Sequence, residues 1–220
     1  MNIFLSHPIT RETPTYGNRD TFESIPKSRI SSGATANTDE WRFSINHFGT
    51  HVDVPLHFIE GAKSITDYGP QDWIFQRPEI IDVPCSDAKL ILPKHIPRIP
   101  EDSDFVMIRT GFERYRADKK YWDAYPALHV DTCVWLRENL QHLKALGIDY
   151  ISMTSPCHRS HGKPAHLALL EEREGQSVLI VEDMHLRHVS GRLVDVLVSP
   201  LMVQHANGAP VTVMATEVRG

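Results

Sequence analysis

The chain has 220 residues, a formal net charge of −5 and a composition, 41% apolar and 23% charged, that is ordinary for a globular protein. The negative charge and the lack of a Lys/Arg cluster argue against nucleic-acid binding. No stretch approaches the roughly 18 apolar residues of a membrane span, and the N-terminus lacks the charged leader of a signal peptide. We therefore expect one cytoplasmic domain, residues 1–220, whose three cysteines stay reduced.

The first half of the chain predicts short strands separated by turns. An apolar run predicts a strand at 2–5, and the polar, turn-rich stretch that follows predicts either a loop over the functional site or an arm that contacts a partner. An alternating strand is expected at 42–46. Beyond it we expect one helical turn at 70–75, strands at 79–84 and 89–92, and a strand buried on both faces at 105–108.

Helices alternate with strands in the second half. Asp131 can cap a helix whose apolar positions follow a three-and-four rhythm up to Gly147, which would end it. A second helix is expected from Pro164 to Glu174. Strands outnumber helices and no linker divides the chain, so the predicted fold class is a single α/β domain with a mixed sheet. The remaining strands are expected at 148–151, 177–181, 194–198 and 211–215.

The segment from His47 to His57 concentrates three imidazoles and one carboxylate in eleven residues. On an extended chain His47, His51, Asp53 and His57 would point to the same side, because side chains two apart share a face. A straight strand would hold His47 about 13 Å from His51, so the chain has to bend at Gly49 before both can reach one ion. Imidazole and carboxylate suit zinc, manganese or iron(II). The segment therefore predicts a metal site.

A metal site needs more ligands than this segment holds. A carboxylate at the exit of a buried strand is expected to face a cation, and both Glu182 and Asp183 stand there. The histidine candidates are His158, His161 and His166, of which the first two could equally be solvated residues of a polar loop. Cys157 could be a soft ligand or a nucleophile, although a cysteine without a CxxC partner is more often structural.

A resemblance to a known family follows from these residues. The run His47-Phe48-Gly49-Thr50-His51-Val52-Asp53-Val54-Pro55-Leu56-His57 resembles the HxGTHxDxPxH signature of the cyclase-like metal hydrolases, which include bacterial kynurenine formamidase and isatin hydrolase. The similarity extends over nearly the whole chain. It includes Leu5-Ser6-His7-Pro8-Ile9, Ile108-Arg109-Thr110-Gly111, Gly147-Ile148-Asp149, Ala165-His166 with Leu169-Leu170, and Val181-Glu182-Asp183.

This resemblance implies a division of roles within the site. It implies a swivelling β/β/α fold, a homodimer or homotetramer, and one or two divalent ions, zinc or manganese. The sequence departs from the formamidase pattern at 172–176, where the longer spacing predicts a longer helix. The implied metal ligands are His47, His51, Asp53, His166 and Glu182, and the implied catalytic acid/base is His57.

The implied activity is hydrolysis of a carbon–nitrogen amide bond in a small molecule, with a metal-activated water as nucleophile and His57 as proton carrier. The first expected substrate is an aryl formamide such as N-formylkynurenine, the substrate of a step in tryptophan catabolism. Two alternatives stay open: hydrolysis or cyclisation of an isatin-like lactam or other cyclic amide, and a metal-binding scaffold without turnover. The aromatic residues near the segment that could stack on an aryl ring are Trp41, Phe48, Phe58 and Trp73.

Overall fold

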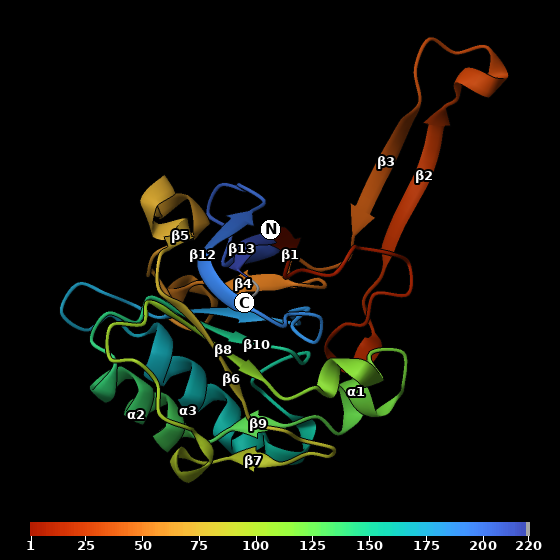
Figure 1. The fold of residues 1–220 in the computed structure, drawn as a ribbon. Helices are drawn as coiled ribbons and strands as arrows, with labels where there is room; N and C mark the ends of the chain where they lie inside the picture. Colours follow the sequence, from red (N-terminus) through yellow and green to blue (C-terminus); the bar gives the residue numbers. More distant parts are fainter. Residues whose placement is uncertain (219–220) are drawn as a thin grey trace.

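A mixed sheet of nine strands forms the centre of the protein in the computed structural model, which describes residues 1–218 (Figure 1). The order is β5-β12-β13-β4-β11-β10-β8-β6, and β1 pairs with β13. β6, β8, β10 and β11 run parallel, whereas β4 is antiparallel to both of its neighbours. β12 also contacts β6, so the sheet curls towards a barrel. The strands are β1 (Asn2–Phe4), β4 (His51–Asp53), β5 (Ile74–Phe75), β6 (Pro78–Asp82), β8 (Phe105–Arg109), β10 (Ala145–Ile148), β11 (Leu179–Glu182), β12 (Arg192–Pro200) and β13 (Gly208–Val218).

Two hydrophobic cores lie on opposite faces of this sheet. Helices α2 (Val130–Asn139) and α3 (Arg159–Leu170) pack together on one face (Figure 1). In β8, Val106 and Ile108 join the core under these helices, while Phe105 and Met107 join the other core. The predicted strand buried on both faces is therefore confirmed, as is the α/β class with a mixed sheet. No helix among residues 1–218 is long and apolar enough to cross a membrane.

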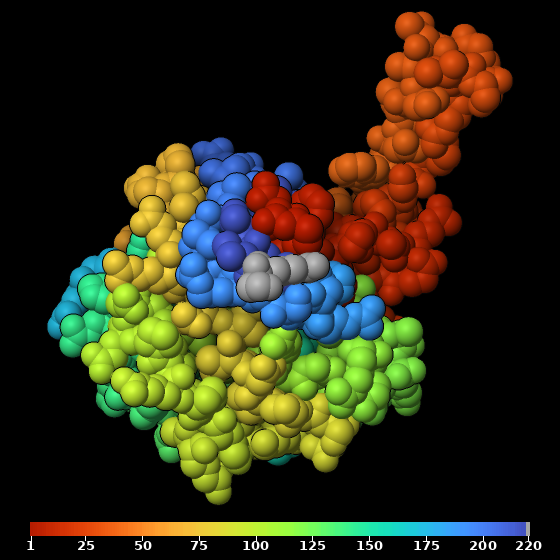
Figure 2. Space-filling model, viewed as in Figure 1, coloured from red at the N-terminus to blue at the C-terminus, as the bar shows by residue number. Residues whose placement is uncertain are grey.

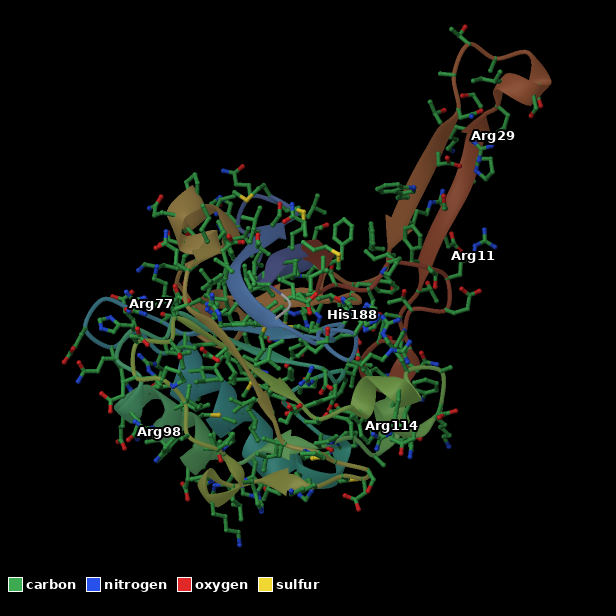
Figure 3. The ribbon with its side chains drawn as sticks, in the orientation of Figure 1. Arg11, Arg29, Arg77, Arg98, Arg114 and His188 are labelled. Carbon is green, nitrogen blue, oxygen red and sulfur yellow. The ribbon has the colours of Figure 1, made fainter. Side chains whose placement is uncertain are left out.

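The turn-rich stretch before residue 44 contains a long hairpin, the arm, which projects from the body (Figures 1 and 2). Its strands are β2 (Phe22–Ser28) and β3 (Thr38–Phe43), and Arg29 lies near its tip (Figure 3). The arm is amphipathic: Phe22 contacts Trp41 and Phe43, while Lys27 pairs with Glu40. A projecting arm is one of the two predicted alternatives, and its contact with a partner stays a prediction. The predicted strand at 42–46 is wrong beyond Phe43, where the chain bends towards the site.

The first long helix is shorter than predicted. It begins at Val130, and His129 caps it by accepting the Asp131 N–H, so Asp131 is not the cap. It ends at Asn139, and Gly147 lies inside β10 instead of ending the helix. A Cβ at Gly147 would lie 2.4 Å from the Met184 sulfur, so close packing requires this glycine. Leu140 and Leu143 are buried without being helical.

The second helix begins earlier and ends earlier than predicted. Pro156 occupies the first position of a 3-10 turn, Pro156–His158, whose Ser155 cap accepts the Cys157 N–H, and α3 follows directly from it. Pro164 lies inside α3, so it does not mark the start. The helix ends at Leu170 and a turn closed by Arg173 and Gln176 follows, so the extra residues at 172–176 do not lengthen the helix.

The end of β11 is fixed by an ion pair of Asp183, the residue that follows Glu182. Asp183 adopts a φ of 54° and is fully buried. Arg116 donates to both of its carboxylate oxygens, at 2.9 and 2.7 Å, and the Tyr121 hydroxyl donates to the first. A short element, α1 (Lys120–Asp123), carries Tyr121. These contacts hold the backbone next to Glu182 in one conformation.

Arg116→Met is expected to lower the free energy of unfolding by about 3–5 kcal/mol, because it leaves the Asp183 carboxylate buried without its cation. Urea denaturation measures this. Arg98→Met, at an exposed arginine outside this pair (Figure 3), is the control and should change stability by less than about 0.5 kcal/mol. Adding Asp183→Asn to Arg116→Met should restore part of the loss. A loss below about 1 kcal/mol would contradict the role of this pair.

Candidate metal centre

The register of β4 places imidazole and carboxylate groups side by side. β4 lies between β11 and β13, and His51 stands directly opposite Glu182. His51 and Asp53 are two residues apart, so both point to the face that α3 covers. α3 contributes His166 from above. The site therefore joins β4 to α3 and β11, both of which follow it by more than a hundred residues in sequence.

Four buried groups converge at this point. His51 Nε2 lies 3.3 Å from Glu182 Oε2 and 3.6 Å from Asp53 Oδ1. His166 Nε2 lies 3.7 Å from Asp53 Oδ2 and 3.7 Å from Glu182 Oε1. All four residues are buried. Two carboxylates thus share a small buried volume with two imidazoles, a combination that is costly unless positive charge balances it.

His47 joins the cluster through the predicted bend. Gly49 adopts a φ of 61°, a left-handed conformation that glycine tolerates, so the bend there is confirmed. His47 Nδ1 reaches Asp53 Oδ1 at 2.7 Å, and a Cβ at Gly208 would lie 2.4 Å from the His47 ring. The donor atoms form two triads, His47-His51-Asp53 and Asp53-His166-Glu182, each with its atoms within 4.8 Å of one another. Asp53 belongs to both.

The hydrogen bonds of the imidazoles favour a bound cation. His51 Nδ1 donates to the Gly49 carbonyl and His166 Nδ1 donates to the Gly162 carbonyl, each at 2.8 Å. In a neutral ring this leaves an Nε2 lone pair, and in both residues Nε2 faces carboxylate oxygens. Lone pairs facing carboxylates repel unless a proton or a cation lies between them. A backbone-oriented imidazole is also how metal-bound histidines are usually held. The residues present therefore fit a divalent metal ion.

The ionisation of the cluster points in the same direction. Burial opposes protonation of His51, but the carboxylates of Glu182 and Asp53 outweigh it and raise its pKa to about 9. Burial also opposes ionisation of Asp53 and Glu182, yet the neighbouring imidazoles keep the pKa of each carboxyl below its usual value. The cluster therefore holds two carboxylates that attract positive charge.

His57 lies beside the triads without belonging to either. It ends a 3-10 turn, Pro55–His57, so the prediction that it continues the strand is wrong, because Pro55 starts a turn. Its ring lies 4.0 Å from the His47 ring and 6.3 Å from the His166 ring, between centroids. Burial lowers the pKa of His57 to about 4, so the imidazole is neutral near pH 7.

The other sequence candidates lie outside the cluster. His158 Nε2 donates to the Ala88 carbonyl, and the His161 ring makes a tilted contact with the His129 ring. Asp183 is bound to Arg116. The cysteine candidate, Cys157, is exposed, with its sulfur 3.7 Å from the Asp123 carbonyl. Of the alternatives left open by the sequence, the structure brings His166 and Glu182 to the cluster.

A cavity of about 390 Å³ opens above the cluster. Of the four aromatic residues expected near a substrate, only Phe58 lines it, stacked on His166 at 4.3 Å between ring centroids. Trp73 and Phe48 are buried elsewhere and Trp41 stands on the arm. Several further lining residues were not predicted, because nothing in their local sequence pattern marks them. These are Pro14, Thr15, Tyr16, Ile45, Ile151, Arg159 and Lys163.

Comparison with known proteins gives consistent matches along the chain. The family model described as putative cyclase matches residues 3–155. Cyclase-like protein 3 of Arabidopsis thaliana is 28% identical, over 94% of this chain and 76% of its own length. A kynurenine formamidase of Bordetella avium is 25% identical, over 97% of both chains. The structure of isatin hydrolase A from Labrenzia aggregata bound to benzyl benzoate superposes with a TM-score of 0.78 at 18% identity, covering 98% of this chain and 93% of that one, which shows a shared fold.

Asp53→Asn is expected to lower the metal content of the purified protein at least tenfold, because the carboxylate shared by both triads is lost. Elemental analysis measures the content. Treatment with a chelator should lower the thermal midpoint of the unsubstituted protein and leave that of the variant unchanged. Asp195→Asn, at an exposed carboxylate on β12, is the matched control. An unchanged metal content in Asp53→Asn would exclude this cluster as the metal centre.

Proposed function

The chain belongs to the putative cyclase family, and on this basis we propose that it is a metal-dependent hydrolase of a carbon–nitrogen amide bond, acting on an aryl formamide. The observation that carries the proposal is the pair of donor triads sharing the buried Asp53 at the floor of the cavity. Kynurenine formamidases align with 95% or more of this chain at 25–27% identity.

The donor set supports a resident divalent ion, zinc or manganese. His47, His51, Asp53, His166 and Glu182 would hold one ion, or two that share Asp53. When bound, such an ion polarises the amide carbonyl and lowers the pKa of the attacking water towards about 7. The surrounding backbone holds the ligands in place: Glu182 Oε1 accepts the Met153 N–H at 2.7 Å while its other oxygen faces His51.

His57 is the proposed acid/base. Its lowered pKa leaves a ring nitrogen free to accept a proton from the attacking water near neutral pH. Within residues 1–218 its ring makes no side-chain hydrogen bond, only ring contacts to His47, Phe58 and His166. The imidazole can therefore turn to deliver that proton to the leaving nitrogen. Three of the proposed ligands, His51, His166 and Glu182, are in contrast held by backbone groups.

The cavity suits a substrate with an aromatic ring. Its volume of about 390 Å³ falls within the usual range for small-molecule sites. Phe58 and Tyr16 offer aromatic surface, and Ile45 and Ile151 add apolar walls. An aryl group would lie between these walls while its formamide reaches the floor. N-formylkynurenine has this shape, and we propose it as the first substrate to test.

An isatin-like lactam is the second candidate, since isatin hydrolase A shares the fold. The metal chemistry would be the same and only the walls would differ. Initial rates with N-formylkynurenine and with isatin, measured on one preparation of known metal content, separate the two. A rate near background on N-formylkynurenine would reject the formamide assignment, and turnover of isatin alone would favour the lactam.

His57→Ala is expected to lower kcat by about 10²–10⁴-fold while leaving the metal content unchanged, because it removes the proton carrier and no proposed ligand. Steady-state assays measure kcat, and elemental analysis of the same sample measures the metal content. His161→Ala, outside the cavity, is the control and should keep full activity. Loss of metal together with activity would make His57 a ligand. Full activity in His57→Ala with bound metal would remove it from the mechanism.

We also propose that a second copy of the chain covers one apolar surface. Phe4, Met214, Leu197 and Ile74 form a continuous cross-strand row over β1, β13, β12 and β5, and they are exposed by 60, 37, 36 and 44%. The apolar face of the arm adjoins this row across a groove of about 740 Å³, and Trp41 is 68% exposed.

A copy of the same chain is the partner that this surface fits. An isolated two-stranded hairpin is at best marginally stable in water, so the arm needs a surface to pack on. The charges on its other face are already paired internally through Lys27–Glu40 and Arg42–Glu40, which leaves the face of Phe22, Trp41 and Phe43 for contact. A two-fold axis would bring each arm onto the apolar row of the other copy, which makes one self-complementary interface.

Met214→Glu combined with Leu197→Glu is expected to weaken self-association at least about 30-fold, equivalent to about 2 kcal/mol, because both charges would be buried in an apolar contact. Sedimentation equilibrium measures the mass of the unsubstituted protein, expected to be at least that of a dimer, and of the variant. Arg98→Glu is the control. An unsubstituted protein that stays monomeric, or a variant that keeps the full mass, would contradict the proposed interface.

We propose the cytoplasm as the compartment. Cys85, Cys133 and Cys157 are all unpaired in the structure, as in proteins kept in a reducing environment.

A further inference from the structure

Two cationic side chains on the first two turns of α3 line the cavity above the proposed metal centre. Arg159, Lys163 and His166 follow one another at spacings of four and three residues, so they lie on one face of the helix. All three line the cavity. With a rise of about 1.5 Å per residue, Lys163 lies about 4.5 Å and Arg159 about 10.5 Å along the helix axis from His166. The helix therefore carries a proposed metal ligand, His166, at the floor of the cavity and two cations nearer its N-terminus.

Neither cation is committed elsewhere in the protein. Among residues 1–218 no carboxylate pairs with Arg159 or Lys163, and neither side chain donates a hydrogen bond. Two other arginines show the contrast, since Arg116 binds Asp183 and Arg109 binds Asp82. Two adjacent cations without a partner repel each other, so an anion placed between them is stabilised. The N-terminal end of α3 adds a partial positive charge at the same place.

The cavity is therefore divided by charge and polarity. Its floor holds the proposed metal ligands Asp53 and Glu182, where the proposed function places the scissile amide. Its middle is bounded by Phe58, Ile45 and Ile151, which suit an apolar or aromatic group. The wall at the start of α3 carries two positive charges, those of Arg159 and Lys163. A ligand that matches all three zones has an uncharged amide at one end, an apolar middle and an anion at the other end.

We propose that Arg159 and Lys163 form a carboxylate-binding subsite, and that the substrates are amides bearing a carboxylate several bonds from the scissile carbonyl. This inference rests on the proposed function, since it assigns the amide to the floor. Arg159 can grip a carboxylate with two parallel N–H donors, and Lys163 adds a point charge nearer to the metal centre. The two residues act on substrate binding and not on the chemical step.

The test compares ligands that differ only in this charge. The substrates are the deaminated analogue of N-formylkynurenine, which keeps the carboxylate, and its uncharged methyl ester. The double variant Arg159→Gln/Lys163→Gln is expected to raise KM for the acid about tenfold, to leave kcat within about twofold, and to leave both constants for the ester unchanged. Added salt should raise KM for the acid in the unsubstituted protein and much less in the variant.

A binding measurement keeps the inference separate from the activity. Benzoylpropionate, which has the carboxylate and the ring but no formamide, and its methyl ester are titrated calorimetrically into the metal-loaded protein. The acid should bind about tenfold more weakly to the double variant, and the ester equally to both. Lys94→Gln/Arg98→Gln, which removes the same charge from exposed positions outside the cavity, is the matched control and should change neither ligand.

The outcomes are distinguishable. Equal losses for acid and ester, or no loss for the acid in kinetics and calorimetry, would overturn the subsite. If the unsubstituted protein hydrolyses neither formamide, the proposed function fails, and the benzoylpropionate titration still decides whether the two cations bind a carboxylate.

Discussion

The burial of Asp53 and Glu182 next to each other is the constraint on which the rest of the site depends. Both carboxylates lie on neighbouring strands with almost no exposure to water. Such groups stay charged only where positive charge lies within a few ångströms. The register of β4 satisfies this by placing His51 between them. A slip of one residue would turn His51 and Asp53 into the second core and bring Val52 to the cluster. The apolar packing of Val52 and Val54 in that core therefore keeps the polar groups on the other face.

Rigidity at the cluster comes from backbone contacts of separate segments. The carbonyls of Gly49 and Gly162 each accept from one imidazole and so aim its other nitrogen at the carboxylates. The Met153 N–H holds Glu182, and the next residue, Asp183, is anchored by Arg116 in the opposite direction. Each group is thus oriented by a different stretch of chain. Preorganisation of this kind is what a metal ion of defined geometry requires, because the ligands do not have to be gathered when it binds.

Local patterns predicted the parts of the site that depend on neighbouring residues. The even spacing of His51 and Asp53, the bend at Gly49 and the doubly buried strand at 105–108 all follow from side-chain alternation and glycine geometry. What depends on distant contacts could not be read in the same way. Glu182 and Asp183 are equivalent in sequence, and only the pairing of β11 with β4 shows which one faces His51. The limits of α2 and α3 were wrong because Leu140 and Leu143 are buried by tertiary packing and Pro156, not Pro164, starts the helical segment. The arm has few residues buried against the body, so the alternation of apolar and polar residues along its strands is weak. Turn-forming residues within and beside these strands hid it further.

The arm and the cavity share their chain connections, and this links the surface of the protein to its chemistry. Tyr16 lines the cavity six residues before β2 begins, and Ile45 lines it two residues after β3 ends. Both walls are therefore continuous with the two ends of the arm, whereas the floor is built from β4, β11 and α3 inside the body. Phe48 packs against Phe22 and Phe43 at the base of the arm, so the arm meets the segment that carries His47. A partner that holds the arm in one position would also hold these two walls. The floor needs no such support, because the sheet register and the helix packing already define it. The walls would contact the parts in which substrates differ, whereas the floor would contact the amide that they share. Self-association would then affect the choice of substrate more strongly than it affects the hydrolysis step.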